Sequence, residues 1–161
     1  MRLLGSGSIF NEALRASKIL AEKYAVSSDV YSATSYKNLR LDALNADRHN
    51  SLHPDAPKQS CYLWDLTKDW KEPVIASSDY VRLVSEQIAP WIEDYTVLGT
   101  DGFGRSEGRE ELRRFFGVDA ESIVHASLQR LEATGKLPKG TAAKALKELG
   151  LDATRKNPLK D

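Results

Sequence analysis

The sequence lacks a second cysteine, an excess of charge of either sign and any long apolar run. The one cysteine, Cys61, cannot form a disulfide within the chain, which favours a reducing compartment such as the cytoplasm. The 23 basic and 23 acidic side chains cancel, so no net charge draws the chain to nucleic acid or to an anionic membrane. No run approaches the roughly 18 apolar residues that cross a bilayer, and residues 1–5 lack the apolar stretch of a signal peptide. We therefore expect a cytoplasmic protein with no nucleic-acid partner and no membrane partner.

The length and composition fit one globular domain. Of the 161 residues, 41 % are hydrophobic and 29 % are charged, which is enough apolar material for a core. We expect a single domain over residues 1–161, with a polar tail at residues 155–161. Residues Met1–Gly5 read like the last part of a strand, which suggests that the chain lacks its natural beginning.

Short apolar runs alternate with helical patterns along the chain. Strands are predicted near residues 3–4, 29–32, 74–76 and 95–98. The segments between and after them repeat apolar residues at helical spacing, as in the first predicted helix, with Phe10, Ala13, Leu14, Ser17, Leu20, Ala21 and Tyr24. This alternation predicts a three-layer α/β fold, in which a mostly parallel (mixed) sheet carries helices on both faces. The loops that follow the strands then meet at one edge of the sheet, namely residues 5–8, 32–36, 77–79 and 99–105.

Short polar side chains stand where helices are expected to begin. We expect one of each candidate pair to cap its helix through the side chain, Ser6 or Ser8 for the first helix and Ser78 or Asp79 for the helix that carries Tyr80. Ser106 and Asp119 are the candidates for two later helices, and acidic residues follow Ser106 as the helix dipole favours.

The turn Gly5-Ser6-Gly7-Ser8 is a candidate anion site. Glycines at the start of a helix let backbone amides approach a phosphate, and the helix dipole favours the negative charge. However, Phe10 stands where the dinucleotide fingerprint needs its third glycine, and no phosphate-binding lysine follows. A tight turn in an α/β domain is the favoured interpretation of Gly5, Ser6, Gly7 and Ser8.

Residues with metal-binding or nucleophilic chemistry are few and scattered. His49 and His53 are four residues apart and could share one helix side with Asp47, but no third ligand is obvious. A polar helix end explains them better. Cys61 has no fixed histidine near it and is expected to be a buried structural thiol, and His125 stands among apolar neighbours. The sequence therefore predicts no catalytic residue, no metal ligand and no cofactor ligand in this chain.

The pair Asp101-Gly102 resembles part of the thiamine-diphosphate motif only superficially. That motif requires Gly-Asp-Gly and a pair of asparagines some 25 residues later, whereas Thr100 precedes Asp101 and no such pair occurs near Leu128. We expect thiamine diphosphate and Mg²⁺ not to bind this domain alone.

The loop from Thr100 to Ser106 is the most distinctive segment. Gly102 and Gly104 permit unusual backbone angles, and Asp101 and Arg105 are expected to pair across the turn and hold it rigid. Phe103 would either pack beneath the loop or project towards a partner. Composition alone leaves open whether this is a structural turn or a functional edge.

The order of several motifs resembles a known family. The chain presents Leu4–Ile9, Ser28–Ser32, Leu52–Pro54, Ser78–Tyr80 and Val97–Ser106, followed by Arg109-Glu110, Leu112-Arg113, Phe116, Val118–Ala120 and Asn157-Pro158. This series is similar to the C-terminal domain of bacterial homodimeric pyruvate dehydrogenases, which are transketolase-type enzymes. The run from Gly99 to Ser106 is the specific part, whereas the turn at Gly5–Ser8 is shared with transketolases in general.

The resemblance implies a role within a larger enzyme. In that family, N-terminal and middle domains, absent from this chain, bind thiamine diphosphate and Mg²⁺ and decarboxylate pyruvate at a dimer interface. The acetyl group then passes to the lipoyl group of the dihydrolipoyl acetyltransferase component. The C-terminal domain supports the homodimer and borders the active-site entrance, so Asp101, Gly102, Phe103, Gly104 and Arg105 are expected at that edge.

Residues 49–70 depart from the family pattern, since His49 replaces the usual aromatic residue and Trp64 and Trp70 are unexpected. Two alternatives remain open. One is a stand-alone α/β module that binds phosphate or another small anion, and the other is the same domain of a different transketolase-type enzyme.

Overall fold

Four short strands form one parallel sheet. The computed structural model describes residues 1–160, and Asp161, the last residue of the expected tail, lies outside the described residues. Strands β1 (Arg2–Gly5), β2 (Asp29–Ser32), β3 (Val74–Ser77) and β4 (Tyr95–Leu98) lie in the order β2-β1-β3-β4. Every neighbouring pair is parallel, with Leu3 opposite both Val30 and Ile75. The four predicted strands are confirmed, and within residues 1–160 the sheet has no antiparallel member.

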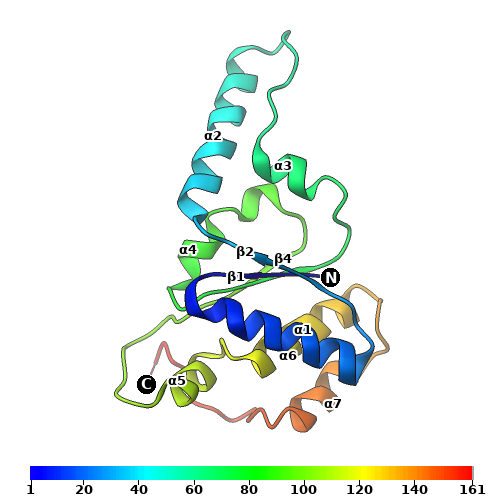
Figure 1. Ribbon diagram of the computed structural model, residues 1–161, viewed down its shortest axis with the longest axis vertical. Helices are drawn as coiled ribbons and strands as arrows, with labels where there is room; N and C mark the ends of the chain where they lie inside the picture. Colours follow the sequence, from blue (N-terminus) through cyan, green and yellow to red (C-terminus); the bar gives the residue numbers. More distant parts are fainter. Residues whose placement is uncertain (161) are drawn as a thin grey trace.

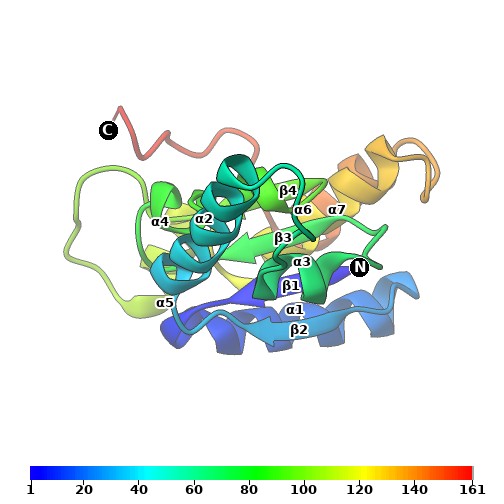
Figure 2. The same ribbon diagram turned by 90° about the horizontal axis from the view of Figure 1, so that it is seen from above.

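Helices cover both faces of this sheet, so the predicted three-layer α/β fold is confirmed (Figure 1). One layer contains α1 (Phe10–Tyr24), α5 (Arg109–Phe116), α6 (Ala120–Ala133) and α7 (Thr141–Glu148). The other contains α2 (Tyr36–Leu52), α3 (Tyr62–Thr67) and α4 (Arg82–Glu86). Figure 2 looks onto the second layer and shows α2 and α3 crossing above the strands. Two short 3₁₀ turns, η1 (Gly7–Ile9) and η2 (Ala89–Trp91), complete the regular structure of residues 1–160.

Alternate strand residues supply two separate cores, as the two-residue period of a strand requires. Leu3 and Ile75 point to the α1 layer, where they join an aliphatic core with α6 and α7. Leu4, Val74 and Ala76 point to the α2 layer, where Ala43, Ala46, Leu63 and Ile88 enclose them. Cys61 is buried in this second core as a free thiol, as expected.

The buried face of α1 differs from the predicted one. Ala13 and Leu20 are buried as expected, but Leu14 is 45 % exposed and Ala21 is also exposed. Ala16 and the carboxylate residue Glu12 take the inner positions instead. The apolar spacing therefore identified the helix correctly. However, the predicted buried face is rotated about the helix axis relative to the observed one.

Only one of the four predicted helix caps is correct. Asp119 caps α6, because its side chain accepts a hydrogen bond from the backbone nitrogen of Ser122 at 3.0 Å. Ser6 and Ser8 donate to other loops, since η1 separates the strand from α1. Helix α4 begins later than expected and α5 begins after Gly108, so Ser78, Asp79 and Ser106 cap neither helix.

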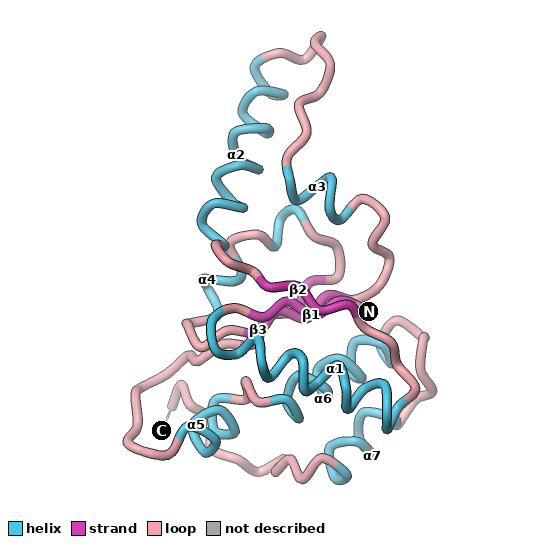
Figure 3. Tube along the Cα trace, in the orientation of Figure 1, coloured by secondary structure: helices cyan, strands magenta, loops and turns pink. Residues whose placement is uncertain are grey.

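Helix α2 projects beyond the body of the molecule. Its second half, residues 45–52, and the returning segment 53–61 form a protrusion that we call the arm (Figure 3). The two sides of the arm are joined at Asn50, whose side chain donates to the carbonyl of Gln59 at 3.0 Å and accepts from its backbone nitrogen at 2.8 Å.

Within residues 1–160, none of the helices is long and apolar enough to cross a membrane.

Candidate functional site at the carboxyl edge of the sheet

The loops that follow the four strands meet at one edge of the sheet, as predicted. In the loop after β2, the backbone nitrogen of Ala33 donates to the carbonyl of Gly5 at 2.9 Å. The hydroxyl of Ser6 donates to the hydroxyl of Ser78 at 2.8 Å, which joins the loops after β1 and β3. Thr100 joins the loop after β4 to them, because its hydroxyl donates to the carbonyl of Asp79 at 2.7 Å and its backbone nitrogen donates to the carbonyl of Tyr80. The carboxyl edge of a parallel sheet is where α/β folds usually bind ligands or partners.

The distinctive loop is held differently from the expected way. Asp101 does not pair with Arg105, so that prediction is wrong. Its Oδ1 accepts from the backbone nitrogen of Arg82 at 2.9 Å and thereby satisfies a free amide at the start of α4. Arg105 instead lies over the ring of Phe115, 4.2 Å from its centroid.

Gly102 and Gly104 have different roles in the same loop. Gly102 has a φ of +126° and faces Pro158 of the tail so closely that an added Cβ would lie 2.2 Å from the Pro158 oxygen. Gly104 has no atom within 4 Å of the corresponding position. Phe103 between them is 77 % exposed, so of its two predicted orientations the structure has the projecting one.

Exposed apolar side chains gather around this loop. Tyr80, Val81, Leu83, Phe103 and Leu159 are each at least 48 % exposed, and we call them the edge patch. They stand on three segments that touch one another, through the Thr100–Tyr80 hydrogen bond and the Gly102–Pro158 contact. An apolar cluster of this kind is typical of a surface that packs against another protein or domain.

A buried carboxylate that was not predicted from the sequence links the edge loops to α5 and α6. Glu12 is 4 % exposed, and its Oε1 accepts from Arg113 Nη1 at 2.8 Å. Its Oε2 accepts from Arg15 Nη1 at 2.7 Å and from the backbone nitrogen of Ala120 at 3.1 Å. The other nitrogen of Arg113 donates to Ser8, which in turn donates to the carboxylate of Asp79. One polar chain thus connects the loops after β1 and β3 with α5 and α6.

A cavity of about 630 Å³ opens beside this polar chain. Its polar wall includes Ser8, Asp79, Thr100 and Arg113, and its apolar floor includes Ile9 and Leu112. The Asp79 carboxylate faces Gly7, because an added Cβ there would lie 3.4 Å from its Oδ1. A negative charge in front of the turn opposes an anion at Gly5–Ser8, so the tight-turn interpretation remains the favoured one. Gly5 itself permits close packing, since an added Cβ would lie 2.7 Å from the Phe10 Cα.

The loop does not fit a diphosphate–Mg²⁺ site. Asp101 is the one acid in a cofactor-like sequence context, and its carboxylate is bonded to the backbone of Arg82. Within residues 1–160, no three His, Cys, Asp or Glu side chains are placed to hold a metal ion.

The three histidines lie away from the edge loops. The rings of His49 and His53 stack with centroids 4.4 Å apart near the tip of the arm, and Asp47 turns away from them to accept from Trp91 Nε1 at 2.9 Å. His125 is half-buried on α6, and this burial lowers the pKa of its imidazole below the ordinary value. The nearby charge of Arg155 lowers the pKa further, whereas a hydrogen bond with the Ala142 backbone raises it.

Comparison with known proteins agrees with this architecture. A family described as the transketolase-like C-terminal domain matches residues 1–119. The chain is 43 % identical to the pyruvate dehydrogenase E1 component of Pseudomonas aeruginosa, over 99 % of this chain and 18 % of the relative. It is 43 % identical to that of Escherichia coli K12, over 98 % of this chain and 18 % of the relative. The same component of Mycolicibacterium smegmatis is 41 % identical over 94 % of this chain and 16 % of the relative.

The chain thus spans less than a fifth of the length of these relatives. The family match covers the whole sheet and every loop of the carboxyl edge up to Asp119. With its parallel sheet and two helical layers, this chain belongs to the transketolase-like C-terminal domain family.

Proposed function

We propose that this chain is the C-terminal domain of a pyruvate dehydrogenase E1 component. The observation that carries the proposal is the 43 % identity to such components over almost the entire chain. Residues 1–161 would then be one domain of a longer subunit, whose N-terminal and middle domains bind thiamine diphosphate and Mg²⁺. The free buried thiol of Cys61 is compatible with the reducing cytoplasm, which is the compartment we propose.

The role of this domain in our proposal is structural. It supports the homodimer and borders the active-site entrance, while the other domains decarboxylate pyruvate and pass the acetyl group to the lipoyl group of the dihydrolipoyl acetyltransferase. The edge patch supports this role, because five large apolar side chains exposed on adjoining segments of the edge are suited to pack against a neighbouring domain. Asp101 and Gly102 fix the loop at its base, so that Phe103 is presented in a defined position.

A chimera tests the proposal. The matched segment of the Escherichia coli E1 component would be replaced by this chain, and the purified chimera assembled with the other components of that complex. We expect a dimer by light scattering and pyruvate-dependent NADH formation, whereas the same enzyme truncated before the segment loses both. A dimeric chimera without turnover would contradict the assignment to pyruvate dehydrogenase.

The edge patch can be tested in the same chimera. Phe103→Ser removes the projecting ring, and we expect weaker dimerisation or a lower kcat/KM because an apolar anchor is lost. Leu14→Ser is the matched control, since Leu14 is an exposed apolar residue on α1 outside the edge patch. Equal behaviour of the two variants would argue against an interface at Phe103.

The 161-residue chain alone is expected to be inactive. Titration calorimetry with thiamine diphosphate and Mg²⁺ should give no heat of specific binding, because Asp101 is engaged by Arg82. Micromolar binding that is lost in Asp101→Asn would contradict this part of the proposal.

A further inference from the structure

Helix α2 carries a stripe of exposed leucines that nothing in the described chain covers. Leu41, Leu44 and Leu52 are 45 %, 38 % and 59 % exposed. They share one side of the helix, opposite the buried Ala43 and Ala46, and span about 16 Å at the usual rise of an α-helix. We call this surface the outer face of α2.

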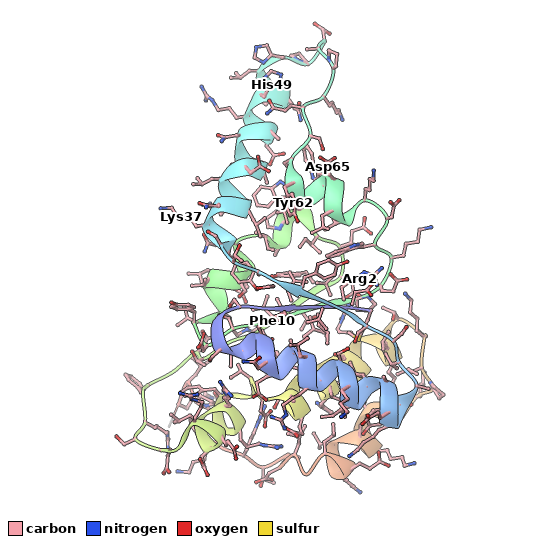
Figure 4. The ribbon with its side chains drawn as sticks, viewed as in Figure 1. Arg2, Phe10, Lys37, His49, Tyr62 and Asp65 are labelled. Atoms are coloured by element: carbon pink, nitrogen blue, oxygen red, sulfur yellow. The ribbon has the colours of Figure 1, made fainter. Side chains whose placement is uncertain are left out.

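The same surface is rich in unpaired positive charge. Lys37 and Arg48 lie within the leucine stripe and Arg40 lies on its flank, and none of the three forms an ion pair with residues 1–160. Figure 4 shows Lys37 on the side of α2 that is turned away from α3. Both acids of α2 are engaged by the chain itself, since Asp42 accepts from the Tyr62 nitrogen at 2.8 Å and Asp47 accepts from Trp91.

Helix α1 shows that this arrangement is not the rule for exposed helices here. Leu14 on α1 is as exposed as Leu41, but it has no second large apolar neighbour exposed on that helix. The cations beside it are paired, Arg15 with Glu12 and Lys18 with Glu22. The combination of an apolar stripe with unpaired cations is therefore specific to α2 among the two longest helices.

The outer face is also held in a fixed position. The Asn50–Gln59 pair closes the arm, and the bonds of Asp42 and Asp47 fasten α2 to the chain on its inner side. A prearranged surface of this kind loses little conformational entropy when a partner binds.

We propose that the outer face of α2 binds an acidic amphipathic helix of another polypeptide chain. Leucines of the partner would pack into the stripe, and flanking glutamates or aspartates would pair with Lys37, Arg40 and Arg48. A second copy of this chain does not fit, because two outer faces placed together would oppose cations to cations. A lipid surface fits poorly, because three leucines offer little apolar area for insertion.

A designed probe tests the proposal on the 161-residue chain. The probe is a fluorescein-labelled synthetic helix of about 18 residues, with leucines on one face and glutamates on both flanks. Fluorescence anisotropy should show micromolar affinity that weakens as salt is added, because part of the attraction is electrostatic. The same peptide with lysines in place of glutamates should not bind.

Matched variants locate the binding site. Leu44→Glu and Arg48→Glu should each weaken binding of the acidic helix by about tenfold, because each removes an attractive group and adds a like charge. Leu14→Glu on α1 makes the same change at a similarly exposed leucine and should leave the affinity unchanged. Circular dichroism checks that each variant is folded. If Leu44→Glu does not fold, Arg48→Glu still tests the site, because Arg48 is exposed.

Four outcomes would overturn the proposal. They are equal binding of the lysine peptide, equal loss of affinity in the α1 and α2 variants, binding of phosphatidylserine vesicles without binding of the acidic helix, and a dimer in sedimentation that Leu44→Glu dissociates. The proposal is independent of the pyruvate dehydrogenase assignment, since none of these measurements depends on turnover.

Discussion

The two helical layers on either side of the sheet are held together in different ways. The α1 layer packs α1, α6 and α7 on an aliphatic core and encloses the carboxylate of Glu12 with three hydrogen-bond donors. The α2 layer relies on aromatic contacts, such as Tyr31 with Trp70 at 5.0 Å between centroids, and on single bonds such as Asp47 with Trp91. The last turns of α2 extend beyond the body of the molecule into the arm (Figure 1). The difference suggests that the α1 layer contributes more to the global stability of the fold. The α2 layer is fixed in place in the folded chain, but we expect it to unfold locally at a lower cost in free energy.

The largest effect is expected at Glu12, the centre of the α1 layer. Glu12→Ala would leave Arg113, whose side chain is 16 % exposed, and the Ala120 amide without their shared acceptor. Removal of one partner from a buried ion pair typically costs about 3–5 kcal/mol, so we expect a loss of that size in the free energy of unfolding, measured by urea denaturation.

Arg15→Ala is the control for Glu12, because it removes a partner of the same carboxylate whose side chain is 58 % exposed. It should cost no more than about 1 kcal/mol, as exposed ion pairs do. Similar losses for both variants would mean that Glu12 is held mainly by the exposed pair and that the α1 layer has no polar centre.

A matched pair of leucines tests whether the two layers open separately. Leu20 in the α1 layer and Leu63 in the α2 layer are both buried, so truncation of either to alanine removes the same group. Leu20→Ala should lower the global free energy of unfolding by about 3 kcal/mol, within the usual range for such cavities. Leu63→Ala should lower it by less and should instead speed hydrogen exchange in α2 and α3, because that layer can open locally. If Leu63→Ala instead speeded hydrogen exchange equally in both layers, the idea that the α2 layer opens separately would be wrong.

The sequence predicted the strands, the sheet edge and the loop cluster because these depend on local periodicity. It did not predict which side chains meet there. Asp101 accepts a hydrogen bond from Arg82, which lies 19 residues earlier in the chain, on the other side of strand β4, and local spacing cannot reveal such a partner. Glu12 was missed because a glutamate in the first turn of a helix ordinarily faces solvent; only its position four residues before Ala16, on the inner face of α1, hinted otherwise.

A smaller effect on stability is expected in the loop from Thr100 to Ser106, between β4 and α5. Gly102→Ala forces an L-residue to a φ of +126° and places its Cβ against the Pro158 oxygen, whereas Gly104→Ala meets open space. We expect Gly102→Ala to cost about 1–3 kcal/mol, the usual strain at such backbone angles, and to release the tail. Gly104→Ala should change stability by less than about 0.5 kcal/mol. Thermal melts and limited proteolysis after Arg155 measure the two effects, and a tail equally protected in both variants would show that Gly102 does not hold it.

The smallest effect concerns His125, which lies in the α1 layer beside α7. Burial lowers the pKa of this imidazole in the folded chain, so the folded state binds a proton less readily than the unfolded state does. Acid therefore favours unfolding through this group: its contribution is complete above the ordinary pKa of 6.5 and is lost as the pH falls below that value towards the lowered one. His125→Gln should flatten this part of the curve of unfolding free energy against pH. Arg155→Gln should flatten it less, because the charge of Arg155 is only a secondary cause of the lowered pKa. If Arg155→Gln flattened the curve as much as His125→Gln, charge rather than burial would dominate, and the α1 layer would be more open to water at this point than its packing implies.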